Sequence, residues 1–297
     1  MCATSCFGQE SRPPGAAAEP AACELFEPVA LVSASILDSG DDLPARMLAV
    51  YNNQAKYIRS IKAVAQVRVI RGAKFGNSAG TTYVIGSFMD FEQPAWLRVT
   101  GVVPPVGNKL FELSSDGREF RLMAPERDKM TLFVGPSEGP PAYRIGNLNL
   151  RPQEFLDVLR WEEGKLGLKS GSRPTVSGQR FVVDVDLPPR TGGSVSGKLQ
   201  FDLAAGLIAS LRIYDAAGEV LSELVYSEWR TANGGSQDAK KGCYPHRIRV
   251  IHPKEDVQLD VRFLEVTLNP QLPRSGFRFK PPRGIPVVHI SETGSDD

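Results

Sequence analysis

Residues 80–135 alternate short runs of apolar residues with polar ones, and each run ends in Gly, Pro, Asn or Asp. Leu97 and Val99, for example, flank Arg98. A period of two predicts consecutive antiparallel strands joined by tight turns. Such a sheet has one apolar and one polar face. The apolar face needs a cover, which the rest of the chain is expected to supply.

Two amphipathic segments are candidates for this cover. A helix is expected to begin near Asp41 or Asp42, because Asp caps helices and Pro44 suits the first turn. Its apolar face is formed by residues three or four positions apart: Met47, Tyr51, Ala55 and Ile58. A shorter helix is expected to open at Pro152, with its apolar side formed by Phe155, Leu156 and Leu159.

Strand patterns return in the second half of the chain, after the shorter helix. We expect roughly ten strands in all, with two strand blocks that form halves of one sheet. Residues 136–146 are expected to form a Pro/Gly-rich bend, and residues 231–243 a polar loop. Side-chain parity defines a set that faces inward: Leu97, Val99, Phe111, Leu113, Phe120, Leu122, Phe181, Val183, Val185, Leu211, Ile213, Leu259 and Val261.

Charge and composition narrow the classes of partner. The 297 residues include 35 basic and 34 acidic ones, which leaves a net charge of +1. This balance does not indicate nucleic acid or an anionic surface as the main partner. No run approaches the ~20 apolar residues of a membrane-spanning helix. We expect a monomer with no cofactor.

The N-terminal segment holds three of the four cysteines, Cys2, Cys6 and Cys23, and the fourth is Cys243. The sequence contains no CxxC pair and no Cys/His cluster, so a zinc site is not expected. Residues 1–38 are expected to form a flexible tether, residues 39–290 a single domain, and residues 291–297 a tail. The start MCATSC resembles that of a mature bacterial lipoprotein, which implies lipid attachment at Cys2. The alternative is that the three N-terminal thiols have no role.

Two short patterns raise the question of catalysis. Residues 76–80 match the nucleophile elbow G-x-S-x-G around Ser78, but that motif needs a following helix, and a strand pattern follows here. Residues 192–198 match a phosphate loop up to its Lys, yet Leu199 stands where Ser or Thr binds magnesium. The three histidines lack metal-binding spacing, and His246 is expected to be a half-exposed residue near the start of a strand.

Three stretches resemble the LolA/LolB family of lipoprotein carriers and receptors: GSFMDFEQPAWLRVTG, LFELSSDGREFRLMAPERDK and VTLNPQLPRSGFRFKPPRGIPVV. The resemblance covers about residues 43–290. It implies a mainly β fold, in which a strongly curved antiparallel sheet forms an incomplete barrel and two or three helices form a lid over a hydrophobic cavity. The family's membrane-anchored member inserts an apolar residue from a loop that matches GVVPPVGN, where Val103 and Val106 lie in this sequence.

The resemblance implies a protein without enzymatic activity that binds acyl chains of lipoproteins or lipids. It would act in the periplasm, either soluble or anchored to the outer membrane by a lipid, in sorting lipoproteins to that membrane. The alternative is an envelope sensor like RseB, which binds lipoprotein or a partner protein. A remote alternative is an esterase that uses Ser78. Periodicity does not distinguish a packed core from a lipid pocket, because both need the same apolar residues.

Overall fold

One curled sheet organises the chain in the computed structural model. The model describes residues 23, 43–72, 81–126, 129–137, 152–159, 166–171, 173–187, 196–234, 242–279 and 281–290. The elements are α1 (Leu43–Tyr57), β1 (Ser60–Arg71), β2 (Thr81–Glu92), β3 (Trp96–Val103), β4 (Asn108–Asp116), β5 (Glu119–Glu126), β6 (Lys129–Pro136), α2 (Pro152–Leu159), β7 (Gly167–Leu168), β8 (Thr175–Ser177), β9 (Arg180–Asp186), β10 (Ser196–Asp202), β11 (Leu207–Tyr214), β12 (Val220–Gly234), β13 (Gly242–His252), β14 (Val257–Leu268), the 3-10 helix η3 (Arg274–Phe277) and β15 (Val287–His289).

The strands lie in the order β15-β6-β5-β4-β3-β2-β1-β14-β13-β12-β11-β10-β9-β7, with β8 paired to β9. The long antiparallel pair of β1 and β14 joins the two halves of the sheet, with Val67 opposite Val261. The expectation that the two strand blocks belong to one sheet is therefore confirmed. The sheet is curled and open, as the incomplete barrel required.

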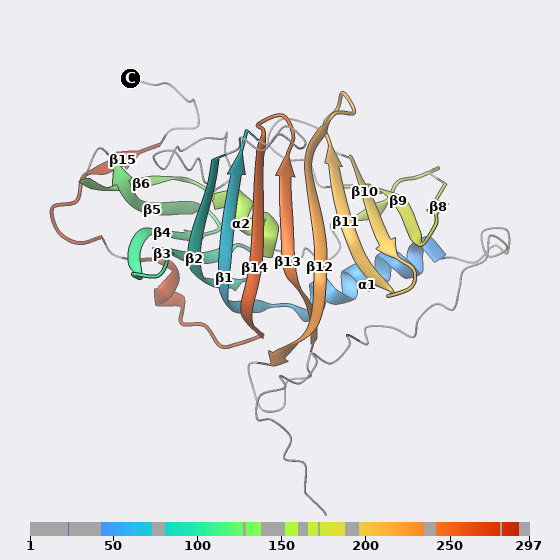
Figure 1. Cartoon of the computed structure of the whole chain (residues 1–297), viewed down its shortest axis with the longest axis horizontal. Helices are drawn as coiled ribbons and strands as arrows, with labels where there is room; N and C mark the ends of the chain where they lie inside the picture. Colours follow the sequence, from blue (N-terminus) through green and yellow to red (C-terminus); the bar gives the residue numbers. More distant parts are fainter. Residues whose placement is uncertain are drawn as a thin grey trace, which may run out of the picture.

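Helices α1 and α2 lie against the same side of the sheet, behind it in the view of Figure 1. The expected face of α1 is buried, because Met47, Tyr51 and Ala55 pack into the main core. We call the side that holds both helices the concave face and the opposite side the outer face. Within the described residues, no helix is long and apolar enough to cross a membrane.

The predicted extent of the polar loop, residues 231–243, is wrong at both ends. Strand β12 continues to Gly234 and β13 begins at Gly242. Thr231 lies opposite Cys243, so backbone pairing with the neighbouring strand overrides the polar composition. The estimate of ten strands also missed short edge strands, such as β7 with two residues and β15 with three. Most of the expected bend at residues 136–146 lies outside the described residues.

The C-terminal segment crosses the outer face after β14. Figure 1 shows this red segment passing through η3 and reaching the far edge of the sheet, where β15 pairs in parallel with β6. Phe279 and Ile285 pack on a small apolar cluster formed by Met123, Leu132 and Val134 on β5 and β6. We call residues 269–290 the C-terminal strap. It gives the left half of the sheet a second, smaller core.

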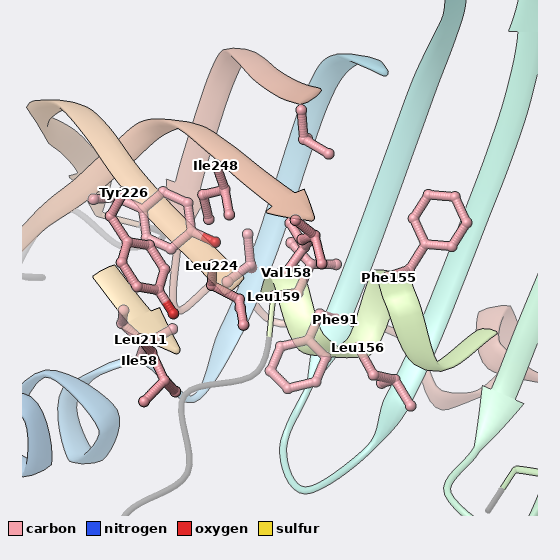
Figure 2. Packing of buried hydrophobic residues seen from close by; sticks show 14 of the residues in the cluster. Ile58, Phe91, Phe155, Leu156, Val158, Leu159, Leu211, Leu224, Tyr226 and Ile248 are labelled. Carbon is pink, nitrogen blue, oxygen red and sulfur yellow. The ribbon is translucent and has the colours of Figure 1, made fainter. Parts of the chain in front are cut away.

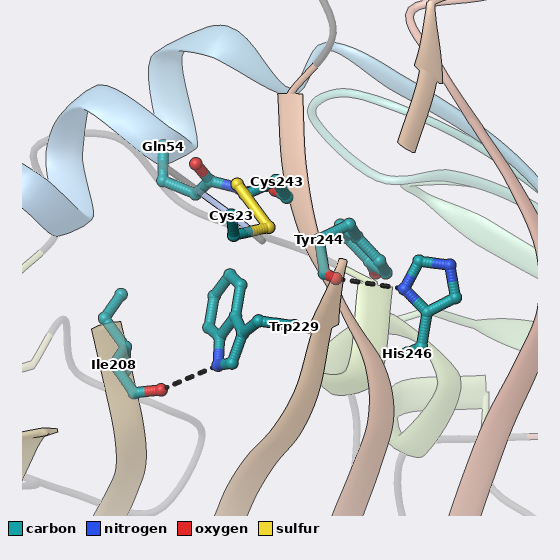
Figure 3. Close-up of a disulfide and its surroundings, with 7 residues drawn as sticks. All are labelled: Cys23, Gln54, Ile208, Trp229, Cys243, Tyr244 and His246. Carbon is teal, nitrogen blue, oxygen red and sulfur yellow. Dashed lines mark hydrogen bonds between the residues drawn. A yellow bond between two sulfur atoms is a disulfide. The ribbon is translucent and has the colours of Figure 1, made fainter. Parts of the chain in front are cut away.

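A disulfide joins Cys23 to Cys243 at the start of β13, with the two Cα atoms 5.7 Å apart. The bond lies next to α1, where the side chain of Gln54 donates a hydrogen bond to the carbonyl oxygen of Cys243 (Figure 3). The interpretation of the N-terminal cysteines as thiols without a role is therefore wrong for Cys23. Cys2 and Cys6 lie outside the described residues.

Candidate functional site

The concave face brings together every residue that side-chain parity placed there. All thirteen are buried in one apolar cluster, and the most exposed of them, Leu211, is only 6% exposed. Both halves of the sheet contribute, since β3 and β4 supply Leu97 and Phe111 while β9 and β14 supply Phe181 and Val261. The expected inward orientation is confirmed. Their role in binding a ligand stays a prediction.

Helix α2 occupies the concave face of the sheet. Its four apolar side chains, Phe155, Leu156, Val158 and Leu159, are at most 2% exposed and belong to the same cluster (Figure 2). The Phe155 and Phe111 ring centroids lie 6.2 Å apart. In this arrangement the helix side chains fill the space between the strands.

One glycine allows this face to pack tightly. Gly101 on β3 lies opposite Phe111 on β4, and the Phe111 ring occupies the place where a Cβ atom of residue 101 would stand. A side chain on β3 at this point would push the ring toward α2. Gly101 thus sets the position of the aromatic pair of Phe111 and Phe155.

Two cavities lined by described residues lie away from this face. One, of about 240 Å³, is lined mainly by polar residues that include Lys169, Asp184 and Lys198. The other, of about 300 Å³, lies between the start of β1 and the strap and includes Arg59 and Glu92. The α2 side chains are packed against the concave face, so a ligand that bound in their place would have to displace them.

The loop between β3 and β4 is exposed, as expected for a membrane-contacting segment. Val103 is 42% and Val106 71% exposed. Pro104 lies over Gly86 of β2, within 3.8 Å of the place where a Cβ atom of residue 86 would stand. The loop is thereby held against the outer face of the sheet.

A polar cluster lies on the outer face beside the strap, where Arg98 lies close to Gly276. Glu112 accepts hydrogen bonds from Arg98 at 2.8 Å and from Lys109 at 2.6 Å. Burial acts to raise the pKa of the Glu112 carboxyl, but these hydrogen bonds and the nearby positive charges outweigh it and hold the pKa below its usual value. Arg274 lies over the Trp96 ring at 4.5 Å, and Phe277 meets that ring edge-on.

No arrangement of catalytic or metal-binding groups is evident in the part of the chain that the structure describes. No group of three or more His, Cys, Asp or Glu side chains is placed to hold a metal ion there. The expectation of a half-exposed His246 is wrong, since it is 8% exposed and its Nδ1 lies 3.1 Å from the Tyr244 carbonyl oxygen (Figure 3). Burial lowers its pKa.

The two enzyme-like motifs do not have the local structure that their chemistry needs. Ser78 lies outside the described residues, but strand β2 begins at Thr81 where the nucleophile elbow requires a helix. Likewise β10 begins at Ser196, inside the phosphate-loop match, so a strand stands where a helix N-terminus would face the phosphate. Both outcomes agree with the expected hairpin and strand.

Several buried residues were not among those expected at the site. Phe91, Met89 and Ile85 of β2 line the same face, and Val158 completes the apolar side of α2. The alternation of residues 83–91 contained the signal for the three β2 residues. The strap cluster on the outer face had no comparable local signal, because its partners are over 140 residues apart in sequence.

Comparison with solved structures identifies the fold. No family model matches the sequence, and no curated protein matches it in sequence. A LolA superfamily protein from Nitrosomonas europaea superposes with a TM-score of 0.52 and 13% identity, covering 78% of this chain and 97% of that one. A domain from Vibrio parahaemolyticus, described as an outer membrane lipoprotein-sorting protein, superposes with a TM-score of 0.51 and 12% identity, covering 78% and 94%. The expected resemblance to the LolA/LolB fold is confirmed.

Proposed function

We propose that this protein binds acyl chains of lipoproteins or lipids on its concave face and acts in lipoprotein localisation in the periplasm. One observation carries the proposal: the large apolar face of an open sheet is shared by α1 and α2, and α2 covers its part with only eight residues, held by four apolar side chains. Apolar contacts are not directional, so an acyl chain can replace those of α2. Each such side chain contributes about 1.5–3 kcal/mol when buried.

Two further findings support this function. The shared fold includes a domain described as an outer membrane lipoprotein-sorting protein. The disulfide between Cys23 and Cys243 suits an oxidising compartment such as the periplasm. Binding requires no catalytic group, so the protein acts without enzymatic chemistry. Lipid attachment at Cys2 and membrane contact by Val103 and Val106 would place it at the outer membrane.

Titration with a fluorescent fatty acid tests the proposal through two opposite changes. Phe155→Ala removes the α2 ring that competes for the concave face, so acyl-chain affinity should rise. Leu122→Phe fills the same face from the sheet, so affinity should fall. Phe277→Ala is the matched control, because it also removes a buried ring, but this ring belongs to the strap on the outer face.

An unchanged affinity in both concave-face variants, with the fold intact by circular dichroism, would contradict acyl binding at this site. Ser78→Ala tests the absence of catalysis separately. It should change neither fatty-acid binding nor any residual ester hydrolysis. Loss of a hydrolysis rate that is proportional to protein concentration would instead support an esterase.

A further inference from the structure

The outer face carries exposed apolar residues that fatty-acid binding on the concave face does not use. Phe88 is 54% exposed, Leu264 62% and Val84 41%. They lie on β2 and β14, on the side of the sheet away from the helices, while their neighbours Met89 and Phe263 are buried. Isolated exposed apolar side chains are ordinary, but a contiguous group marks an interaction surface.

Strand register shows that these residues are contiguous. Phe88 lies directly opposite Val64 on β1. Val64 pairs with Glu265 on β14, where a bulge leaves Leu264 as the extra residue beside it. Three adjacent strands therefore present Phe88, Val64 and Leu264 side by side.

The patch continues over β2 into the loop after β3. Gly86 has no side chain, and Val102 and Pro104 lie over it, between Val84 and Phe88 along the strand. We call Val64, Val84, Phe88, Val102, Pro104 and Leu264 the outer patch. The exposed Val103 and Val106 belong to the loop that Pro104 holds against it.

Arginines border the outer patch on the same face. Arg68 lies opposite Val84, and Arg262 stands two residues before Leu264. Arg247 and Arg249 follow on the neighbouring strand β13. Their one carboxylate partner in these strands is Asp260, which Arg247 binds at 2.6 Å. Among the described residues, Arg262 pairs only with Glu228, at 3.7 Å, and Glu228 also pairs with Arg230.

This local excess of positive charge is hidden in the balanced net charge of the chain. Within the described residues, Arg68 and Arg249 form no ion pair, although both lie opposite Asp260 in the register. At the other end of the patch, charge is mixed, with Lys62 opposite Asp90 and Glu265 beside Leu264. The outer patch is therefore bordered on one side by the guanidinium groups of Arg68 and Arg249, unpaired among the described residues, and on the other side by residues of both charges.

The shape and charge of this surface select its partner. A peptide helix needs a groove, whereas this is the outer side of a curled sheet. A second copy of the chain, packed through the same patch, would bring two arginine clusters together. A fluid bilayer adapts to protruding side chains, accepts apolar residues at its interface, and supplies anionic headgroups to neighbouring arginines.

We propose that the outer patch and its bordering arginines dock the protein onto an anionic phospholipid surface, with Phe88 and Leu264 entering the interface. This site is separate from the concave face, and docking does not depend on acyl-chain binding there. It leaves the concave face turned away from the bilayer surface.

Flotation with lipid vesicles tests the docking surface. The purified chain without a lipid anchor should bind vesicles of phosphatidylcholine with phosphatidylglycerol, and bind pure phosphatidylcholine vesicles at least about tenfold more weakly. The double variant Phe88→Ser, Leu264→Ser should lower binding by about tenfold or more. The double variant Arg68→Glu, Arg249→Glu should lower it similarly and make the remainder insensitive to salt.

Matched controls lie outside the patch. Leu168→Ser changes an apolar residue of β7 that is 38% exposed, and Arg173→Glu changes an exposed arginine in the same part of the chain. Both should bind vesicles like the unchanged protein. Equal binding to neutral and anionic vesicles, or unchanged binding by both double variants, would overturn the proposal. So would a dimer in solution that the Phe88→Ser, Leu264→Ser variant dissociates.

The concave-face function is measured on the same proteins. Both outer-face double variants should keep the fatty-acid affinity of the unchanged protein, and Leu122→Phe should keep vesicle binding. Failure of vesicle docking with intact fatty-acid binding would refute the outer-face site alone. Failure of fatty-acid binding with intact docking would refute only the concave-face function.

Discussion

The Sγ atoms of Cys23 and Cys243 are bonded across 220 residues of sequence, so Cys23 is fixed to the first residues of β13. A cross-link that closes a long loop restricts the unfolded chain. Such bonds typically contribute about 2–4 kcal/mol to the free energy of unfolding.

A deletion that keeps Cys23 and one that removes it should therefore differ in their effect on thermal stability. Removal of residues 1–22 should leave the thermal midpoint unchanged. Removal of residues 1–38, or Cys23→Ser, should lower the midpoint by several degrees. Reductant should lower the midpoint of the unchanged protein by a similar amount. Equal midpoints for both deletions would show that the bond does not stabilise the fold.

Gly101→Ala should destabilise the protein by about 1–3 kcal/mol, because the added methyl group meets the Phe111 ring in a packed face. Denaturant unfolding measures this directly. Gly167→Ala is the control, since no atom lies within 4 Å of its added Cβ and its backbone is not left-handed. A neutral effect at position 101 would mean that the Phe111 ring has free space beside it.

Glu112 should make the protein sensitive to acid. Its pKa is lower in the folded than in the unfolded state, so the unfolded chain binds more protons as the pH falls. The stabilisation is present above the ordinary glutamate pKa of about 4.3 and is lost as pH falls through the folded value.

Glu112→Gln should cost about 1.5–3 kcal/mol at neutral pH, the range for hydrogen bonds to charged groups, and should flatten the loss of stability below about pH 4.3. Urea unfolding across pH measures both effects. Glu119→Gln breaks a more exposed pair with Arg121 and should cost less than about 1 kcal/mol. Identical pH profiles for the unchanged protein and Glu112→Gln would refute this assignment.

The strap should be held by its buried ring more than by its ion pairs. Phe277 is 2% exposed, so Phe277→Ala should cost about 3–5 kcal/mol and speed hydrogen exchange in β15. Arg278 is largely exposed where it binds Asp116 at 2.6 Å, so Arg278→Ala should cost less than about 1 kcal/mol. A larger loss from Arg278→Ala would reverse this ranking.

Much of the fold could be predicted from local patterns. The parity of Leu97, Phe111 and Val261 depends only on the period of a strand, and the start of α2 at Pro152 follows from helix geometry. Local sequence patterns do not predict contacts between residues that are far apart in the sequence. The local sequence around Thr231 predicts a loop, but Thr231 lies in a strand because it pairs with β13.

The limits for the candidate site have the same physical origin. Four cysteines allow three pairings if all are bonded, so spacing could not select Cys23 with Cys243. Met123 and Val134 point outward by parity, yet the strap buries them. Periodicity identified the concave face but not its occupant, because the placement of α2 depends on packing rather than on pattern.

Cross-linking with a photoreactive fatty acid tests acyl binding on the concave face most directly. Illumination of the complex, followed by peptide mapping, should label Phe111, which packs against α2, Leu122 of the same buried cluster, and also Phe155. An excess of unlabelled fatty acid should abolish the labelling, and Phe155→Ala should increase it on the strands. Labelling confined to the outer face, or none that a competitor removes, would contradict the account.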